Sequence, residues 1–206
     1  MNIIFKQISK GTKYIFLFCK LCADLNKNIS NDLSEQKNMK NNKKRNLKLI
    51  VNDKCIKFLN ELKEEENKIE KDKIITKSDD LRNKIFGFVI FVIGAIKVEI
   101  LKQQFGFYVL EQLYKLINTE NIDEIHNIFL EGIILLANKL GTIVYEKDNK
   151  KILQNINTFI DNNLLVLIDA ENKIRNISIP IYLRYRILNL LTKKENQWKN
   201  TFLDIS

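Results

Sequence analysis

The sequence predicts an all-α protein, and three observations lead to that prediction. Glycine and proline are rare, with 6 Gly and 1 Pro in 206 residues, whereas β-sandwiches and glycine-dependent nucleotide folds need many turn residues. Apolar residues recur at helical spacing in one segment after another. Polar stretches rich in Asn and Lys separate these segments, as loops separate helices. With 45% hydrophobic residues, the chain can bury the core of one domain.

The N-terminal part predicts a helix followed by a loop. Residues 1–9 have the composition of the end of a helix, and a further helix is predicted over residues 12–26. Its inward face is predicted from the apolar residues at helical spacing, which are Tyr14, Leu17, Phe18, Leu21 and Leu25. Residues 28–46 are polar, basic and rich in asparagine, so we expect a mobile loop there.

The middle of the chain predicts three helices. The first covers residues 47–69 and ends in a charged half, whose acidic run at 64–66 is typical of a solvated face. Ser78 is a good N-cap for the second, over residues 78–97. Residues 85–96 are apolar nearly all round, so we expect them to be the most buried segment. The third helix covers residues 101–117, and its predicted inward face is made by Phe105, Val109, Leu110, Leu113 and Ile117.

The C-terminal part predicts three more helices. Asn121 and Glu124 resemble a capping box at the start of a helix that we expect to end near Gly141. Another helix is predicted over residues 148–162. Ser178 is predicted to cap the last helix, with Pro180 in its first turn. The buried seam of that helix is predicted to consist of Leu183, Ile187, Leu190 and Leu191.

The order of these helices predicts how they pack. Antiparallel pairs in succession, each too narrow to bury its own apolar stripe, are typical of a helical solenoid. The predicted fold is therefore one domain over residues 1–206, built from HEAT-like helix pairs stacked into an armadillo-type superhelix. A single globular helix bundle is the alternative.

The charge of the chain bears on its partners. It has 34 Lys and Arg against 25 Asp and Glu, a formal net charge of +9, which favours RNA, acidic proteins or anionic lipid. The densest basic stretch contains Lys40, Lys43, Lys44 and Arg45, which are candidates for RNA contacts. The alternative is that they belong to a solvated loop.

Catalytic and metal-binding patterns are sparse. The single histidine, His126, lies within a predicted helix, where a structural role fits better than general-base chemistry. Cys19 and Cys22 form a CxxC motif, but no second pair completes a zinc site, and Cys55 stands alone. We therefore expect no enzyme activity, metal, cofactor or small-molecule substrate. Three sparse cysteines suit a reducing compartment, and we expect a cytoplasmic protein without a membrane-spanning segment.

The end of the chain is the strongest candidate for partner binding. Arg184 and Arg186 lie on the last predicted helix, and Lys194, Trp198 and Lys199 follow. Tryptophan and arginine are the residues that most often anchor protein interfaces. The alternative for Trp198 is that it packs under the end of the helix as a lid.

Several segments resemble a known family. Residues 183–199, LRYRILNLLTKKENQWK, resemble the end of the middle domain of translation initiation factor 4 gamma, in which an Arg-aromatic helix is followed by a polar turn and a Trp. Residues 81–83 (LRN), 91–94 (FVIG) and 100–101 (IL) are similar to an arginine-rich entry into that family's Phe-Ile-Gly helix. Residues 135–141 resemble its Leu-x-x-x-Gly helix end. Residues 4–25 are similar to its Ile-Phe-x-Lys…Tyr-x-x-Leu-Cys region.

The resemblance implies a function. It implies a stack of HEAT-like helix pairs that binds the DEAD-box helicase initiation factor 4A and mRNA, and so supports recruitment of mRNA to the ribosome. It also implies that most of the family's first repeat is missing from this chain. Two alternatives stay open: a scaffold of the same fold for another RNA-processing helicase or complex, as in splicing or nonsense-mediated decay, and a basic RNA-binding helical module.

Overall fold

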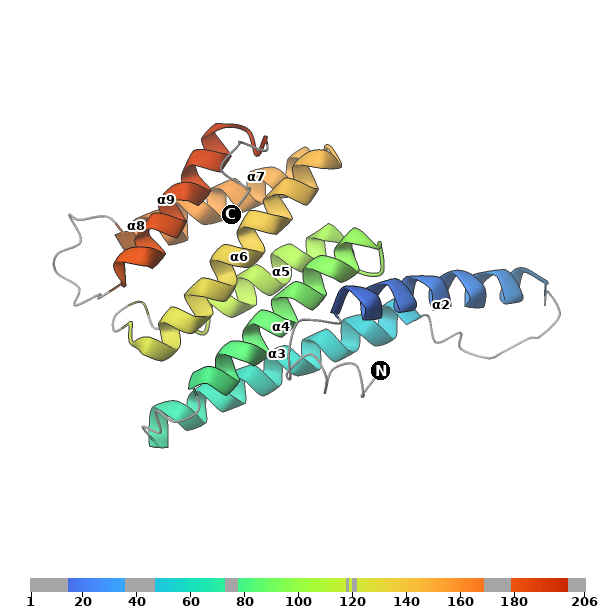
Figure 1. The fold of residues 1–206 in the computed structure, drawn as a ribbon, viewed down its shortest axis with the longest axis horizontal. Coiled ribbons are helices and arrows are strands. Elements are labelled where there is room, and N and C mark those ends of the chain that lie inside the picture. Colours follow the sequence, from blue (N-terminus) through green and yellow to red (C-terminus); the bar gives the residue numbers. More distant parts are fainter. Residues whose placement is uncertain are drawn as a thin grey trace.

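Helices account for nearly all of the residues that the structure, a computed structural model, describes: residues 15–35, 47–72, 78–117, 119, 122–168 and 179–199. No strand occurs among these residues, and the all-α prediction is confirmed. The elements in chain order are α2 (Ile15–Glu35), α3 (Leu47–Asp72), α4 (Ser78–Lys97), α5 (Gln103–Tyr114), α6 (Glu124–Glu146), α7 (Lys150–Phe159), the π-helical turn η2 (Ile160–Leu165), α8 (Val166–Ile168) and α9 (Ile181–Glu195) (Figure 1).

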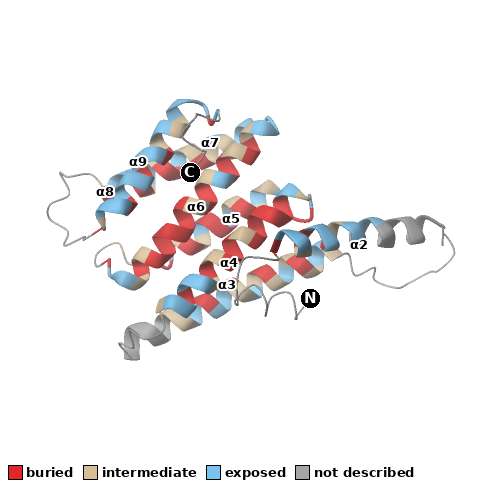
Figure 2. Ribbon diagram, in the orientation of Figure 1, coloured by how far each residue is buried: buried red, intermediate tan, exposed pale blue. Residues whose placement is uncertain are grey.

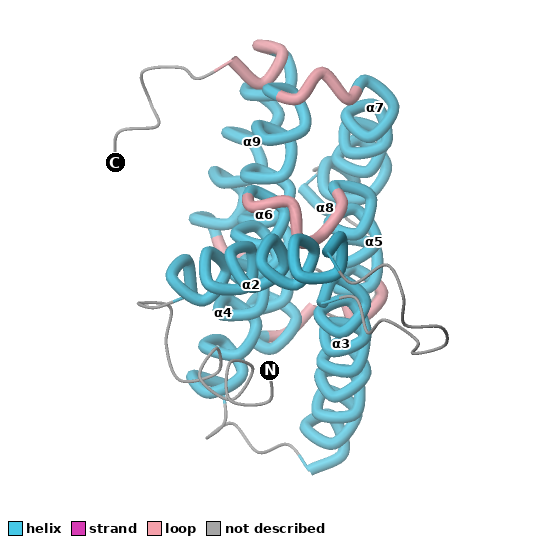
Figure 3. Tube along the Cα trace, turned by 90° about the vertical axis from the view of Figure 1, so that its right-hand side faces the viewer, coloured by secondary structure: helices cyan, strands magenta, loops and turns pink. Residues whose placement is uncertain are grey.

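The longer helices pack in two layers. In one layer α4 packs between α2 and α6, and α6 also packs against α9. In the other layer α5 packs against α3 and α7. Figure 3 shows α4, α6 and α9 on one side of the molecule and α3, α5 and α7 on the other. Contacts of α6 with α5 and α7 join the two layers.

The centre of the core lies where α4 and α6 meet (Figure 2). Residues 85–96 of α4 are buried except for two half-buried positions, but residues 126–137 of α6 are buried to the same extent, so the prediction that 85–96 is the most buried segment is confirmed only in part. Gly132 of α6 allows the close approach, since a Cβ atom at this position would lie 2.6 Å from Cγ2 of Ile85. Helix α6 itself is long and apolar enough to cross a membrane, contrary to our expectation that no segment is. Because 72% of its apolar window is buried in the fold, it has the character of a core helix.

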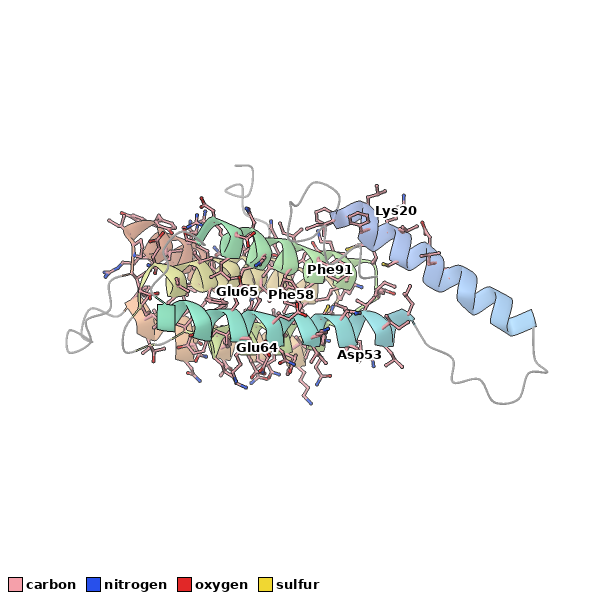
Figure 4. The ribbon with its side chains drawn as sticks, turned by 90° about the horizontal axis from the view of Figure 1, so that it is seen from below. Lys20, Asp53, Phe58, Glu64, Glu65 and Phe91 are labelled. Atoms are coloured by element: carbon pink, nitrogen blue, oxygen red, sulfur yellow. The ribbon has the colours of Figure 1, made fainter. Side chains whose placement is uncertain are left out.

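Helix α3 lies against α4 through one aromatic and one charged contact. The rings of Phe58 and Phe88 stack with their centroids 4.8 Å apart, and Lys84 Nζ lies 2.8 Å from Glu65 Oε1. Figure 4 shows Phe58 and Glu65 on the side of α3 that faces α4, whereas Glu64 lies on the opposite side. The acidic run at 64–66 is therefore not wholly a solvated face.

Helix α2 corrects two predictions. It continues to Glu35, so residues 28–35 are helical rather than part of a loop, and residues 36–46 lie outside the described residues. Its predicted inward face is wrong for three residues, because Leu17, Leu21 and Leu25 are 62%, 48% and 45% exposed, whereas Phe18 is half-buried and Tyr14 lies outside the described residues. The residues that pack against the core are instead Ile15, Cys19 and Cys22.

A glycine explains this orientation of α2. Gly94 of α4 leaves room for Cys19, whose Sγ would lie only 2.7 Å from a Cβ atom at position 94. The same thiol donates a hydrogen bond to the carbonyl oxygen of Phe91 at 3.6 Å. A small thiol can approach the α4 backbone here, whereas a leucine is too large, so the helix turns its cysteine face inward.

Several predicted helix ends are also corrected. The capping box of α6 is formed by Asp123 and His126 rather than by Asn121, which lies outside the described residues, and Glu124. Asp123 Oδ1 accepts from the His126 N–H at 3.0 Å, and His126 Nδ1 accepts from the Asp123 N–H at 3.3 Å. Helix α6 continues past Gly141 to Glu146. Pro180 is the N-cap of α9, and Ser178 lies outside the described residues.

Candidate partner-binding surface on helix α9

Helix α9 has two apolar stripes, and only one of them is buried. Leu183, Ile187 and Leu190 form the predicted seam and are at most 2% exposed, while Leu191 is half-buried. On the other side, Ile181 is 70%, Tyr185 62% and Leu188 46% exposed. We call this side, together with its neighbouring polar residues, the α9 surface: Ile181, Tyr182, Arg184, Tyr185, Arg186 and Leu188.

A buried carboxylate holds the start of the α9 surface in place. Glu131 of α6 is 4% exposed and accepts a hydrogen bond from the hydroxyl of Tyr182. Arg82 of α4 places Nη2 3.4 Å from the same carboxylate, so three helices meet at one charge. Burial raises the pKa of Tyr182, and its hydrogen bond to Glu131 raises it further. The hydroxyl therefore remains a proton donor to Glu131 at neutral pH.

The two predicted arginines belong to this surface. Arg184 Nε donates to the carbonyl oxygen of Ile179 at 3.2 Å, which ties its side chain to the start of the helix. The guanidinium carbon of Arg186 lies 5.8 Å from the centre of the Tyr182 ring, within the range of a cation–π contact. Both residues are exposed. The surface therefore presents planar cationic groups beside aromatic rings, a combination common in protein interfaces.

Trp198 packs under the end of α9 as a lid, which was the alternative to a role in partner binding. It is 2% exposed, and its indole packs against Gly141, where a Cβ atom would lie 2.3 Å from the ring. Its Nε1–H donates to Asn157 Oδ1 at 3.0 Å. Gln197 and Trp198 have φ values of 55° and 60°, and the Trp198 N–H donates to the Lys193 carbonyl oxygen at 2.7 Å. The chain thus turns back on α9 and places the indole inside, where a partner cannot reach it.

Of the other predicted partner-binding residues, Lys194 forms an ion pair within the fold and Lys199 is exposed to solvent. Lys194 pairs with Asp161 of η2, so its ammonium group ties α9 to that turn. Lys199 is exposed just after the lid. Arg184 and Arg186 are both exposed, but they lie two positions apart on α9 and therefore flank the exposed apolar stripe on opposite sides. Neither is brought together with Lys194, Trp198 or Lys199. Lys40, Lys43, Lys44 and Arg45 lie outside the described residues.

The prediction from sequence missed the aromatic and acidic parts of the site. The exposed stripe of Ile181, Tyr185 and Leu188 has the spacing i, i+4, i+7, so it was visible as a second apolar stripe beside the seam. Glu131 gave no such signal, because a single acidic residue in an apolar helix pattern does not indicate which residues of other helices will contact it.

Comparison with known proteins adds no relative: no family model matches the chain, and neither the curated proteins nor the solved structures contain a match.

Proposed function

We propose that this protein is a non-enzymatic, HEAT-like helical scaffold that binds a DEAD-box helicase of the initiation factor 4A type, together with mRNA, in cytoplasmic translation initiation. The observation that carries the proposal is the α9 surface, an exposed stripe with Tyr185 at its centre and an arginine on each flank, on a helix that a buried carboxylate holds in register.

The order of helix packing supports the HEAT-like part of the proposal. Helices α2, α4, α6 and α9 follow one another in one layer, while α3, α5 and α7 follow one another in the other. In a solenoid each helix pair contacts its neighbours along the chain in this way, whereas a single bundle gathers its helices around one axis.

The sequence resemblance supports the choice of partner. Arg184 and Tyr185, which carry the resemblance to the middle domain of initiation factor 4 gamma, are exposed on the α9 surface. Trp198, the other residue of that pattern, has a supporting role, because its buried indole fixes the end of the helix that presents them.

The proposed mechanism is differential binding without chemistry. A scaffold that binds one conformation of a two-lobed helicase more tightly than another shifts the population towards that conformation. The arginines of the α9 surface suit carboxylates of the helicase, because a guanidinium group can donate two parallel hydrogen bonds to one carboxylate.

The test measures both binding and stimulation of the helicase. The RNA-stimulated ATPase rate of a 4A-type helicase is compared in the presence of the native chain and of a variant with Arg184→Ala, Tyr185→Ala and Arg186→Ala. We expect the native chain to raise the rate and the variant to bind about 10- to 100-fold more weakly, as loss of interface hot spots does. Lys20→Ala with Lys97→Ala, two exposed lysines away from α9, is the control for lost positive charge.

The outcomes separate the proposal from its alternatives. Equal rates with and without the native chain at saturating concentration would exclude helicase stimulation. If the chain instead binds RNA alone, with an affinity that falls steeply with salt and does not change in the triple variant, it is a basic RNA-binding module. Trp198 is left unchanged in this test, because its substitution would alter folding as well as binding.

A further inference from the structure

A groove of about 340 Å³ lies between the start of α3 and the start of α5. Its apolar lining comes from Leu49 of α3, Ile100 and Leu101 of the α4–α5 turn, and Phe105 and Tyr108 of α5. This volume is within the range of pockets that bind ligands. The groove is separate from the α9 surface, since α9 and α3 lie on opposite sides of the molecule (Figure 1).

Two of the five apolar lining residues are open to solvent, whereas Ile100 and Leu101 form the buried floor of the groove. Leu49 is 59% and Tyr108 38% exposed, and both are large side chains. The rings of Phe105 and Tyr108 lie with their centroids 5.8 Å apart, so they form a continuous aromatic wall. A leucine or aromatic side chain of a partner that entered the groove would remove this surface from water.

The charge around the groove is positive. Lys48, Lys102, Asn52 and Gln104 are its polar lining residues, and among the residues that the structure describes no aspartate or glutamate lines it. The carboxylate in the adjacent turn, Glu99, pairs with Lys147 Nζ at 2.7 Å and also interacts electrostatically with Lys48, so it offsets only part of the positive charge of the two lining lysines.

Two helix N-termini add to this positive charge. Helix α3 begins at Leu47 and α5 at Gln103, next to the lining residues Lys48 and Gln104. Neither helix has an acidic residue in its first turn, and the side chain of Lys102, the N-cap of α5, makes no capping hydrogen bond. The N-terminal end of a helix carries partial positive charge and favours a carboxylate.

We propose that this groove binds an acidic segment of a partner protein in which a leucine or aromatic anchor stands next to aspartate or glutamate. The anchor occupies the space between Leu49 and Tyr108, and the flanking carboxylates face Lys48, Lys102 and the first turns of α3 and α5. The aliphatic part of the lining, Leu49, Ile100 and Leu101, distinguishes this partner from RNA, because a phosphate backbone gains little from aliphatic side chains. The inference does not depend on the helicase proposal.

The test uses fluorescein-labelled heptapeptides and the full chain. In the probe set, one Leu, Phe or Trp is moved through a peptide of otherwise alternating Asp and Glu, and binding is measured by fluorescence anisotropy at low salt. We expect at least one of these peptides to bind. Replacing its anchor with serine, or its acids with asparagine and glutamine, should each weaken binding about tenfold or more, since each change removes one of the two kinds of contact.

Variants then locate the binding to the groove. Lys48→Glu with Lys102→Glu and, separately, Leu49→Asp should weaken the best peptide at least tenfold, whereas Lys20→Glu with Lys97→Glu should change it less than twofold. Circular dichroism checks that each variant folds, and Leu49→Ala with Tyr108→Ala replaces Leu49→Asp if that variant does not. The proposal is overturned if no acidic peptide binds or the groove variants bind as the native chain does. It is also overturned if a uridine hexanucleotide binds with the same sensitivity to these variants.

A result on the groove is independent of the result on α9. The triple variant of Arg184, Tyr185 and Arg186 should bind the acidic peptide as the native chain does, and the groove variants should still stimulate the helicase. A loss of both activities in either variant would show a folding defect rather than a binding site.

Discussion

Helices α2 and α9 lie at the two ends of the layer that contains α4 and α6, and the core holds them in different ways. Each packs against a glycine, α2 through Cys19 at Gly94 and α9 through Trp198 at Gly141. The described contacts of α2 with the core are made by apolar and thiol side chains. Helix α9 adds polar links, including Tyr182 to Glu131, Lys193 to Asn138 at 3.1 Å and Lys194 to Asp161.

The difference has a consequence for function. Apolar contacts are non-directional, whereas hydrogen bonds and ion pairs depend on geometry, so polar links fix both the rotation and the register of a helix. The exposed residues of α9 are therefore presented in one orientation, as a binding surface requires. Helix α2 has an apolar arc wider than the part that it buries, and its orientation depends on which residue fits at Gly94.

The largest effect is expected from removing the lid on α9. Trp198→Ala should lower the free energy of unfolding by about 3–5 kcal/mol, because it removes a large buried side chain and leaves a cavity next to Gly141. Trp198→Phe should cost less, since a ring remains and only part of the packing and the bond to Asn157 are lost. Urea unfolding followed by circular dichroism measures both, and equal stability of Trp198→Ala and the native chain would show that the lid does not hold α9.

The two glycines allow a direct comparison of the two ends. Gly141→Ala should destabilise by about 1–3 kcal/mol through overpacking, because three atoms of the rigid Trp198 ring would lie 2.3–2.5 Å from the new Cβ atom. Gly94→Ala should change stability by less than about 1 kcal/mol, since the clash with one thiol is offset by the better helix propensity of alanine. The same urea series checks this order.

A double substitution tests the cause at the α2 end. If the Cys19 thiol is the obstacle, Gly94→Ala should cost less in a Cys19→Ala background than in the native chain. Identical costs in the two backgrounds would contradict the contact between α2 and Gly94.

The polar link of α9 should contribute a smaller amount. Tyr182→Phe keeps the ring beside Arg186 and removes the hydroxyl that donates to Glu131, which should cost about 1 kcal/mol, the usual value of one hydrogen bond. Glu131 retains Arg82 as a partner, which limits the loss. Tyr185→Phe on the exposed side of the same helix is the matched control, and we expect its midpoint of urea unfolding to equal that of the native chain.

The smallest effect should be absent at neutral pH and appear only in alkaline solution. Burial raises the pKa of Cys19 from 9.0 to about 12, and it also raises the pKa of Tyr182 from 10.0. A raised pKa in the folded state gives stability that is present below the unfolded pKa and is lost as the pH rises through the folded pKa. The contribution of Cys19 to the free energy of unfolding should therefore begin to fall above about pH 9. The contribution of Tyr182 should begin to fall above about pH 10.

Two variants separate these contributions. The decrease in the urea midpoint from pH 9 upwards should be shallower in Cys19→Ala, whereas Tyr182→Phe should differ in slope from the native chain only above pH 10. The reverse order of the two onsets would contradict the assignment.

Much of the fold could be predicted because it depends on local pattern. The helices over 47–72 and 78–97 agree with their predicted starts, since periodic apolar residues and a capping serine are properties of neighbouring residues. The rotation of α2 could not be predicted in this way. Its leucines and its cysteines both form apolar stripes, and the choice between them depends on Gly94, which belongs to a different helix far along the chain.

The candidate site likewise has some features that follow from local sequence and others that depend on tertiary packing. Arg184 and Arg186 were identified from their residue types, and the stripe of Ile181, Tyr185 and Leu188 was open to the same analysis. The role of Trp198 required the fold, because nothing in residues 190–199 indicates that two residues with positive φ return the chain to Gly141.

The amino-acid pattern alone specifies that this protein is helical, where most of its helices begin, and that arginine and aromatic residues gather near its C-terminal end. The packing of α2, the burial of Trp198 and the meeting of Arg82, Glu131 and Tyr182 depend on the assembled helices. The reason is physical: helix formation depends on residues within a few positions of one another. Burial and buried charge depend instead on which distant side chains fill the same space.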